Sequence, residues 1–449
     1  MSTAHFKVHE HTIPSCHIRE YARTLASDDQ GDVLQLAIKQ YTPRKRAQTA
    51  KNEITIIGAH ANGFPKELYE PLWDDLYERL AKRNIHIHGI WIADVAHQGH
   101  SGVLNEEKLG NDPSWADHPR DLFLMVNHFR QHMKRPLIGI GHSMGGNNLV
   151  NLSIMHPRLL TTLILIDPVI QRTPGAGNFS PAQASVKRRD LWPSRQAAAE
   201  KLKSSKFYQA WDPRVLDKWI QYGLRDLPTY IHPQASPTST PTPALNADPS
   251  SATSFPADKP VTLTTTKHQE VLTFIRLNHP THNNPTPGTE PNYLTHPDAD
   301  PAHGPISPFY NPYLTSTFLQ LPHLRPSVFY IFGDPAAGAH MSEPVLIADR
   351  LANTGVGVGG SGGAKKGRVR SVSFAGIGHL IPMEVTGKTA DAAVGWLGPE
   401  IERWRMMEDA ERREWAAVPR REKGLMSEEY VRVMTGDWHR DGVVKTAKL

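Results

Sequence analysis

The sequence predicts an α/β protein with a mostly parallel central sheet flanked by helices. Three observations lead to this prediction: short β-branched runs, amphipathic segments between them, and the return of the same alternation late in the chain. Strands separated by helices form βαβ units, whose strands lie parallel and whose crossovers are right-handed. The strands are expected at residues 54–58, 85–92, 136–140, 162–166, 327–332 and 368–374.

Helices are expected between these strands because apolar residues recur there at intervals of three or four positions. The clearest case is a helix over 66–83, in which leucines recur at every fourth position, at Leu68, Leu72, Leu76 and Leu80. Further helices are expected at 117–133, 146–156, 344–351 and 389–396.

Two parts of the chain depart from this alternation. Residues 232–260 and 279–308 are rich in proline, serine and threonine, and they hold too few apolar groups to offset the entropy of folding, so we expect loosely held loops there. Residues 400–424 mix both signs of charge, which is typical of a solvated helix. The predicted division is a core at 1–170 and 309–400, a cap insertion at 171–308 and a charged helical tail at 401–449.

The composition excludes several classes of protein. Cys16 is the single cysteine among 449 residues, so neither an intrachain disulfide nor a cysteine-ligated zinc site is expected. No run of 18 apolar residues predicts a transmembrane helix, and the first residues lack the apolar core of a secretion signal. The 50 lysines and arginines barely exceed the 45 acidic residues, which does not indicate nucleic-acid binding.

The strongest chemical signal is the sequence Gly141-His-Ser143-Met-Gly145. It follows a predicted strand and opens a predicted helix, the context in which G-x-S-x-G forms a tight turn that exposes the serine. Because of this context we favour Ser143 as a nucleophile over a chance serine in a glycine-rich turn. The backbone N–H of Met144 would then face the reacting carbonyl at a helix N-terminus, where negative charge is stabilised.

A serine attacks a carbonyl only when a base takes its proton. The best base is His379, which follows the last predicted strand and so completes the expected order of nucleophile, acid and histidine. Two aspartates compete to orient it. Asp334 follows Gly333 directly, a position that favours a turn or capping role. Asp167 ends the strand at 162–166 and is preferred, with Asp334 kept as the alternative acid.

A second backbone donor for the oxyanion is expected in the small-residue loop after the first parallel strand. That loop contains Asn62 and Phe64, and the sequence does not separate the two. Both remain candidates beside Met144, because a loop of small residues lets a backbone N–H approach the substrate.

These motifs resemble those of the α/β-hydrolases, in the order expected for that fold and over residues 54–170 and 325–400. The narrower resemblance is to fungal peroxisomal lipase and toxin-biosynthesis hydrolases, in which some members carry the acid in a similar Leu-Asp-Pro setting. It implies an α/β-hydrolase fold with a helical cap insertion. The motifs are His60-Ala-Asn-Gly-Phe-Pro65, Asp94-Val-Ala-His-Gln-Gly-His-Ser101, Gly141-His-Ser-Met-Gly-Gly146, Leu163-Ile-Leu-Ile-Asp-Pro168 and Gly378-His-Leu-Ile-Pro-Met383.

We therefore expect a serine hydrolase that cleaves an ester, a lipid or an acyl thioester through an acyl-enzyme, with no metal or organic cofactor. The alternatives are a carbon–carbon bond hydrolase with the same triad and a non-catalytic member of the fold. Aromatic residues of the cap, among them Phe207, Trp211 and Trp219, either line an acyl pocket or form the core of the cap.

The chain ends in Ala447-Lys448-Leu449, which matches the small–basic–leucine form of a peroxisomal address. Such an address is read by an import receptor and does not anchor the protein in a membrane. The expected location is the peroxisomal matrix, or otherwise the cytoplasm.

Overall fold

The computed structural model describes residues 4–45, 52–172, 179–233, 259–277, 296–298 and 309–436. Residues Met1–Gly398 form one compact unit and Pro399–Leu449 a second. Most of the predicted loops 232–260 and 279–308, and the whole C-terminal tripeptide, lie outside the described residues.

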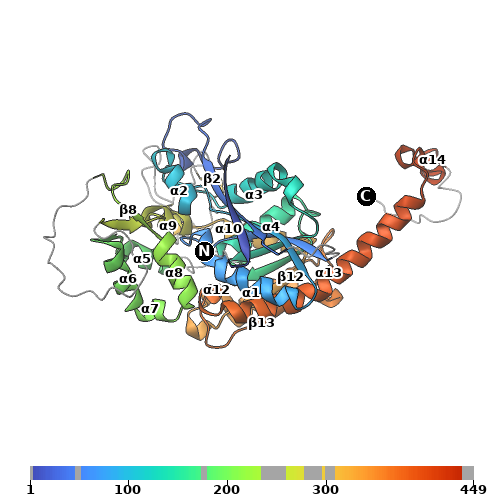
Figure 1. The fold of residues 1–449 in the computed structure, drawn as a ribbon. Coiled ribbons are helices and arrows are strands. Elements are labelled where there is room, and N and C mark those ends of the chain that lie inside the picture. The colour runs from blue at the N-terminus through green and yellow to red at the C-terminus, as the bar shows by residue number, and fades with distance from the viewer. Residues whose placement is uncertain are drawn as a thin grey trace. The chain divides into compact units, whose positions relative to one another are not determined.

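The first unit is built on an eight-stranded sheet, which confirms the predicted fold class (Figure 1). The strand order is β1-β2-β4-β3-β5-β6-β12-β13, with β1 and β2 antiparallel to their neighbours and all other pairs parallel. Every strand predicted from the sequence is present. The strands are β1 Phe6–Pro14, β2 Gln35–Pro43, β3 Glu53–Ala59, β4 His86–Ala93, β5 Leu137–His142, β6 Thr162–Ile166, β12 Ser327–Phe332 and β13 Val369–Ser373.

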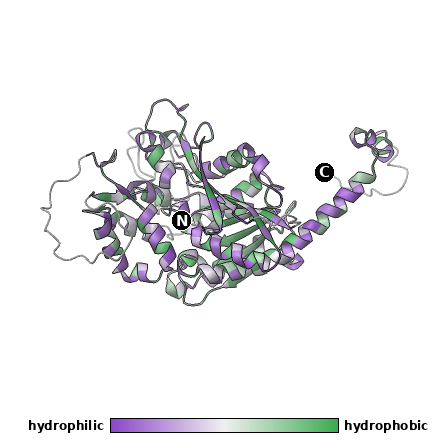
Figure 2. Ribbon diagram, viewed as in Figure 1, coloured by the Kyte–Doolittle hydropathy of each residue, from purple (hydrophilic) through white to green (hydrophobic). Residues whose placement is uncertain are grey.

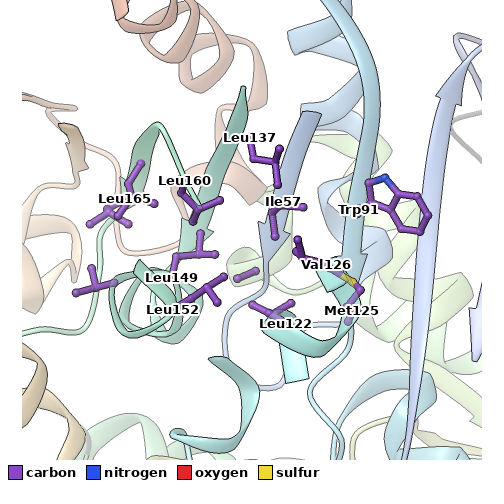
Figure 3. Packing of buried hydrophobic residues seen from close by; sticks show 14 of the residues in the cluster. Ile57, Trp91, Leu122, Met125, Val126, Leu137, Leu149, Leu152, Leu160 and Leu165 are labelled. Carbon is purple, nitrogen blue, oxygen red and sulfur yellow. The ribbon is translucent and has the colours of Figure 1, made fainter. Parts of the chain in front are cut away.

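Helices cover both faces of this sheet. On one face, α3 (Asp117–His128) and α4 (Met144–Met155) pack over a buried cluster that includes Ile57, Leu122 and Leu149 (Figure 3). On β12 the side chains alternate between the faces. Tyr330 belongs to that cluster, whereas Phe329 stacks on Trp396 of α13 (Thr386–Ala417), with ring centroids 5.5 Å apart. Helix α13 therefore lies on the opposite face.

Most of the remaining core helices lie between consecutive strands of the parallel part of the sheet, as βαβ units require. A short 3₁₀ turn leads into the first of them, where the sequence predicted one continuous helix over 66–83. The helices and 3₁₀ turns are η1 Ala22–Thr24, η2 Lys66–Tyr69, α1 Glu70–Ala81, α2 Gly99–Leu104, η3 Glu106–Lys108, η4 Arg130–His132, α10 Tyr313–Gln320, η6 Leu321–His323, η7 Pro335–Ala337, η8 His340–Ser342, α11 Pro344–Asn353, η9 Ala364–Lys366 and α12 Ile381–Glu384.

The insertion between β6 and α10 forms short helices and a small sheet beside the core (Figure 1). Its strands pair antiparallel in the order β7-β9-β8, and β10 pairs with β11. The resemblance implied a helical cap here, but strands of two or three residues are too short to show a periodicity. The elements are α5 Phe179–Lys187, β7 Leu191–Trp192, α6 Arg195–Lys203, α7 Lys206–Gln209, α8 Pro213–Tyr222, β8 Leu224–Asp226, β9 Val261–Leu263, α9 Lys267–Phe274, β10 Arg276–Leu277 and β11 Phe309–Tyr310.

The second unit contains the C-terminal half of α13, the turn η10 (Glu422–Gly424) and α14 (Glu428–Met434). Hydrophilic residues predominate along this half of α13, whereas the inner strands of the large sheet, such as β5, β6 and β12, are largely hydrophobic (Figure 2). Among the described helices, none has the length and apolar character needed to cross a bilayer.

Candidate active site

Ser143 lies in a sharp turn between the end of β5 and the start of α4. Its backbone has φ +56° and ψ −118°, a combination that a non-glycine residue adopts only when its surroundings impose it. The flanking glycines make the turn possible. A Cβ added to Gly141 would lie 2.6 Å from the carbonyl oxygen of Gly145, and one added to Gly145 would lie 2.1 Å from that of Ala59. The turn holds Ser143 in this strained conformation.

His379 reaches Ser143 from the loop between β13 and α12. Its Nε2 lies 2.8 Å from Ser143 Oγ, a hydrogen-bonding distance at which the ring can accept the hydroxyl proton. The two residues are 236 positions apart in sequence. The structure thus brings the predicted nucleophile and base together.

Asp167 follows β6 directly and is completely buried. Its Oδ2 lies 2.5 Å from His379 Nδ1, and Ser342 Oγ donates a hydrogen bond to its other oxygen. Burial opposes the ionisation of this carboxyl, but hydrogen bonding to His379, the charge of that ring and the Ser342 hydroxyl together hold its pKa below the ordinary 3.8. The ionised carboxylate fixes the proton of His379 on Nδ1 and leaves Nε2 to face Ser143.

The alternative acid, Asp334, does not reach His379. Its carboxylate caps the short turn η7 by accepting from the Ala336 N–H at 2.9 Å, and it accepts from the Gly376 N–H at 2.8 Å. These two backbone donors lower the pKa of Asp334. The residue therefore has the turn-capping role that its place directly after Gly333 favours.

The two candidate loop donors differ in how their backbone N–H groups are used. The Phe64 N–H donates to the Ala61 carbonyl at 3.2 Å, which makes Phe64 the less favourable of the two candidate oxyanion donors in this loop conformation. Among the described residues, no partner is found for the Asn62 N–H. The Met144 N–H, at the first position of α4, has no partner within the helix either. Met144 and Asn62 thus each keep a backbone N–H for which no partner is found among the described residues.

Several residues that support this arrangement were not predicted from the sequence. His142 is buried, and its Nε2 donates to the His379 carbonyl at 3.0 Å while its Nδ1 accepts from Tyr69. Burial and the neighbouring His379 lower the pKa of His142 to about 3, so the ring is neutral. Tyr69 in turn accepts from the Ala61 N–H at 2.8 Å. This chain links the loop before η2 to the loop that carries His379.

Arg350 supports the segment that follows Asp167. The side chain is fully buried and donates to the carbonyls of Pro168 and Ile170, both at 3.0 Å, and of Met341. Neither Arg350 nor Ser342 stands in a motif, because the partners that they bind in the segment from Asp167 to Ile170 lie far away in sequence. Only an alignment of relatives would have singled out these two residues.

Aromatic side chains of the cap pack beside the loop that holds Asn62. The Phe64 ring lies 5.7 Å from the Trp211 ring and 5.9 Å from the Trp219 ring, centroid to centroid. Both tryptophans are buried, whereas Phe207 is 57% exposed. No group of three or more histidine, cysteine, aspartate or glutamate side chains within the described residues is placed to hold a metal ion.

Comparison with known proteins places the chain among hydrolases. The family model described as serine aminopeptidase, S33, matches residues 72–302. Type I acyl-CoA thioesterase mpaH of Penicillium roqueforti is 44% identical over 420 residues, which cover 92% of both chains. Type I acyl-CoA thioesterase mpaH' of Penicillium brevicompactum is 42% identical over 420 residues, which again cover 92% of both chains.

A solved structure shows the same fold at low sequence identity. The peroxisomal α/β-hydrolase Lpx1 of Saccharomyces cerevisiae matches 98% of this chain and 99% of its own, with a TM-score of 0.62 and 16% identity. The family model covers half of this sequence, and the two Penicillium relatives match nearly all of it. The chain is therefore an enzyme that belongs to the serine aminopeptidase S33 family of hydrolases, on the α/β-hydrolase fold.

Proposed function

We propose that this protein is an acyl-CoA thioesterase that uses Ser143 as nucleophile, His379 as base and Asp167 as the orienting acid. The observation that carries the proposal is the continuous hydrogen-bonded chain from Asp167 through both nitrogens of the His379 ring to Ser143 Oγ, with steps of 2.5 and 2.8 Å. This is the arrangement by which a serine is activated for acyl transfer.

In the proposed acylation step, Ser143 Oγ attacks the thioester carbonyl carbon while His379 Nε2 takes the hydroxyl proton. The carbonyl oxygen becomes an oxyanion and accepts hydrogen bonds from the backbone N–H groups of Met144 and Asn62. Collapse of this intermediate breaks the carbon–sulfur bond. The coenzyme A thiolate takes the proton from His379 and leaves as the free thiol, and the acyl group stays on Ser143 as an ester.

In deacylation, His379 takes a proton from a water molecule as that water attacks the ester carbon. A second oxyanion forms in the same position and collapses with release of Ser143, which recovers its proton from His379. The products are a free carboxylic acid and coenzyme A. The charge on Asp167 stabilises the imidazolium that forms in each half-reaction.

The choice of acyl-CoA among acyl substrates is supported by the two Penicillium relatives, which are named acyl-CoA thioesterases and match this chain over 92% of its length. Phe64, which is only partly buried and packs against the buried rings of Trp211 and Trp219, provides an apolar surface next to the proposed oxyanion donor. A surface of this kind suits an acyl chain better than a charged group.

A substrate panel tests this choice. We expect kcat/KM to be highest for one or more acyl-CoA thioesters, lower for p-nitrophenyl esters and lowest for triacylglycerols. Ester cleavage in the absence of thioester cleavage would instead indicate an esterase or lipase. Cleavage of a 1,3-diketone, without either of these activities, would indicate a carbon–carbon bond hydrolase. Failure of a fluorophosphonate probe to label Ser143 would indicate a non-catalytic member of the fold.

We further propose that the protein is imported into peroxisomes through Ala447, Lys448 and Leu449, which a matrix import receptor would bind. The yeast protein that shares the fold is itself named a peroxisomal hydrolase. A fusion with a fluorescent protein at the N-terminus should colocalise with a peroxisomal marker, and deletion of these three residues should release it to the cytosol. An unchanged distribution after deletion would contradict the proposal.

Cys16 should be inert, in contrast to Ser143. The thiol is half-buried, and burial together with the negative charge of Asp121 raises its pKa to about 12. Because only the thiolate reacts rapidly, the thiol should stay protonated and unreactive from pH 7 to 8. After treatment with iodoacetamide, we expect mass spectrometry to show Cys16 unmodified and the enzymatic activity to be unchanged. Rapid alkylation with loss of activity would contradict this expectation.

A further inference from the structure

We propose that Gln98 is a positioning residue for the oxyanion hole and that, together with helix α9 of the cap, it fixes the loop that carries the Asn62 N–H. The inference rests on the proposed function, because it assigns Asn62 as one of the two oxyanion donors. It adds a residue from a different loop and an element from the insertion to the machinery of the reaction.

Gln98 lies in the loop between β4 and α2, and it is completely buried. Its Oε1 accepts from the Gly63 N–H at 2.8 Å, and its Nε2 donates to Asn62 Oδ1 at 2.6 Å. A backbone N–H can only donate, so the Gly63 bond fixes which end of the Gln98 amide is the oxygen. One side chain therefore binds two successive residues of the oxyanion loop.

Helix α9 holds the same loop from the other side. Asn62 Nδ2 donates to the Glu270 carbonyl at 3.0 Å, and Gln98 Nε2 also donates to Thr273 Oγ1 at 3.1 Å. Both partners lie on α9, one turn apart. The packing is close, since a Cβ added to Gly63 would lie 2.8 Å from Glu270 Cδ and the backbone there has φ +81°.

The position of α9 is itself fixed by buried polar contacts. The Glu270 carboxylate accepts from Ser185 Oγ of α5 at 2.6 Å and pairs with Arg188. At the other end of the helix, Trp115 Nε1 donates to the Thr273 carbonyl at 2.6 Å. These bonds tie α9 both to the rest of the cap and to the core.

The arrangement leaves the Asn62 backbone N–H as the group without a partner, although both ends of its side chain are bound. The hydrogen bonds of the Asn62 side chain thus fix the position of the residue, and the Asn62 backbone N–H stays available for the reacting oxygen. Preorganised donors of this kind act on the transition state because they need no reorientation when charge develops. Loss of the hydrogen bonds made by Gln98 should therefore lower kcat more than it weakens substrate binding.

The test compares Gln98→Met with the wild type in the full-length enzyme, on the acyl-CoA that the wild type cleaves best. Methionine has a similar length and keeps the packing, but it makes none of the three hydrogen bonds. We expect kcat to fall about 10- to 100-fold, less than for outright deletion of a donor, with KM changed by less than about threefold. Phenylboronic acid, which forms a tetrahedral adduct with the serine, should lose affinity in parallel with kcat.

Thr265→Val is the matched control, because it removes a different hydrogen bond between cap and core. Thr265 Oγ1 accepts from the Gly99 N–H at 2.9 Å, and no hydrogen bond is found between Thr265 and the described residues of the oxyanion loop. We expect its kcat to stay within about threefold of wild type. Circular dichroism and thermal unfolding should show both variants folded at the assay temperature.

Three outcomes would overturn the inference. The first is an unchanged kcat in folded Gln98→Met, and the second is an equal loss in Thr265→Val, which would assign the effect to docking of the cap in general. The third is a loss of kcat with unchanged affinity for phenylboronic acid. Ser143→Ala, measured in parallel, separates the two proposals. If Ser143→Ala is inactive while Gln98→Met keeps the wild-type kcat, only the role of Gln98 is rejected, whereas full activity of Ser143→Ala rejects the proposed function.

Discussion

Ser143→Ala is expected to lower kcat by about 10³-fold or more, because alanine has no atom that can form the acyl-enzyme. Ser143 Oγ is 2.8 Å from His379 Nε2, so removal of the hydroxyl also leaves the base without its proton donor. The substrate should still bind, because its acyl and coenzyme A groups do not depend on this hydroxyl. The measurement is steady-state release of free thiol from acyl-CoA, together with fluorophosphonate labelling, which should disappear.

A serine from the helix that follows Ser143 provides the control for this variant. Ser153 is buried in α4, and its Oγ donates to the Leu149 carbonyl at 2.9 Å. Ser153→Ala makes the same chemical change 10 residues further along the chain, away from His379, and should keep kcat within about threefold. A Ser143→Ala enzyme whose kcat stays within tenfold of wild type would reject the proposed mechanism.

The parts of the fold that were predicted correctly depend on local patterns. The turn at Ser143 was foreseeable because strand, glycines and helix are adjacent in sequence. The two N-terminal strands were not predicted, although they complete the sheet. In β2 a buried lysine, Lys39, interrupts the apolar pattern, and it is tolerated there because it pairs with Glu67 at 3.1 Å and Glu70 at 3.5 Å. A buried charge with distant partners cannot be recognised from its neighbours in sequence.

The same limit applies to the candidate site. The spacing within the loop after β3 leaves Asn62 and Phe64 equivalent, and the backbone bond from Phe64 to Ala61 separates them. Gln98 and Ser342 bind their partners across 35 and 175 residues of sequence. Gln98 stands in the motif at 94–101, but nothing in that motif indicates that its side chain binds the loop after β3. Such supporting residues are defined by the tertiary structure and not by local composition.

Asp167→Asn is expected to lower kcat by roughly 10²- to 10⁴-fold while the protein stays folded. Asparagine retains the shape, and its amide can turn so that Oδ1 still accepts from His379 Nδ1 and Nδ2 donates to Ser342. Even then the negative charge that stabilises the imidazolium is gone. In the other orientation the amide donates to Nδ1, which forces the proton onto Nε2 and prevents that nitrogen from accepting the Ser143 proton.

Asp334→Asn provides the comparison that separates the two candidate acids. Its carboxylate accepts from the backbone of Ala336 and Gly376, and an asparagine oxygen can accept one or both of these bonds. We expect kcat within about threefold of wild type, with at most a small fall in melting temperature from a weakened cap. If Asp334→Asn were the variant that lost activity while Asp167→Asn kept it, His379 would have to take its orienting carboxylate from the loop after β12. The 2.5 Å contact between Asp167 and His379 would then have no part in catalysis.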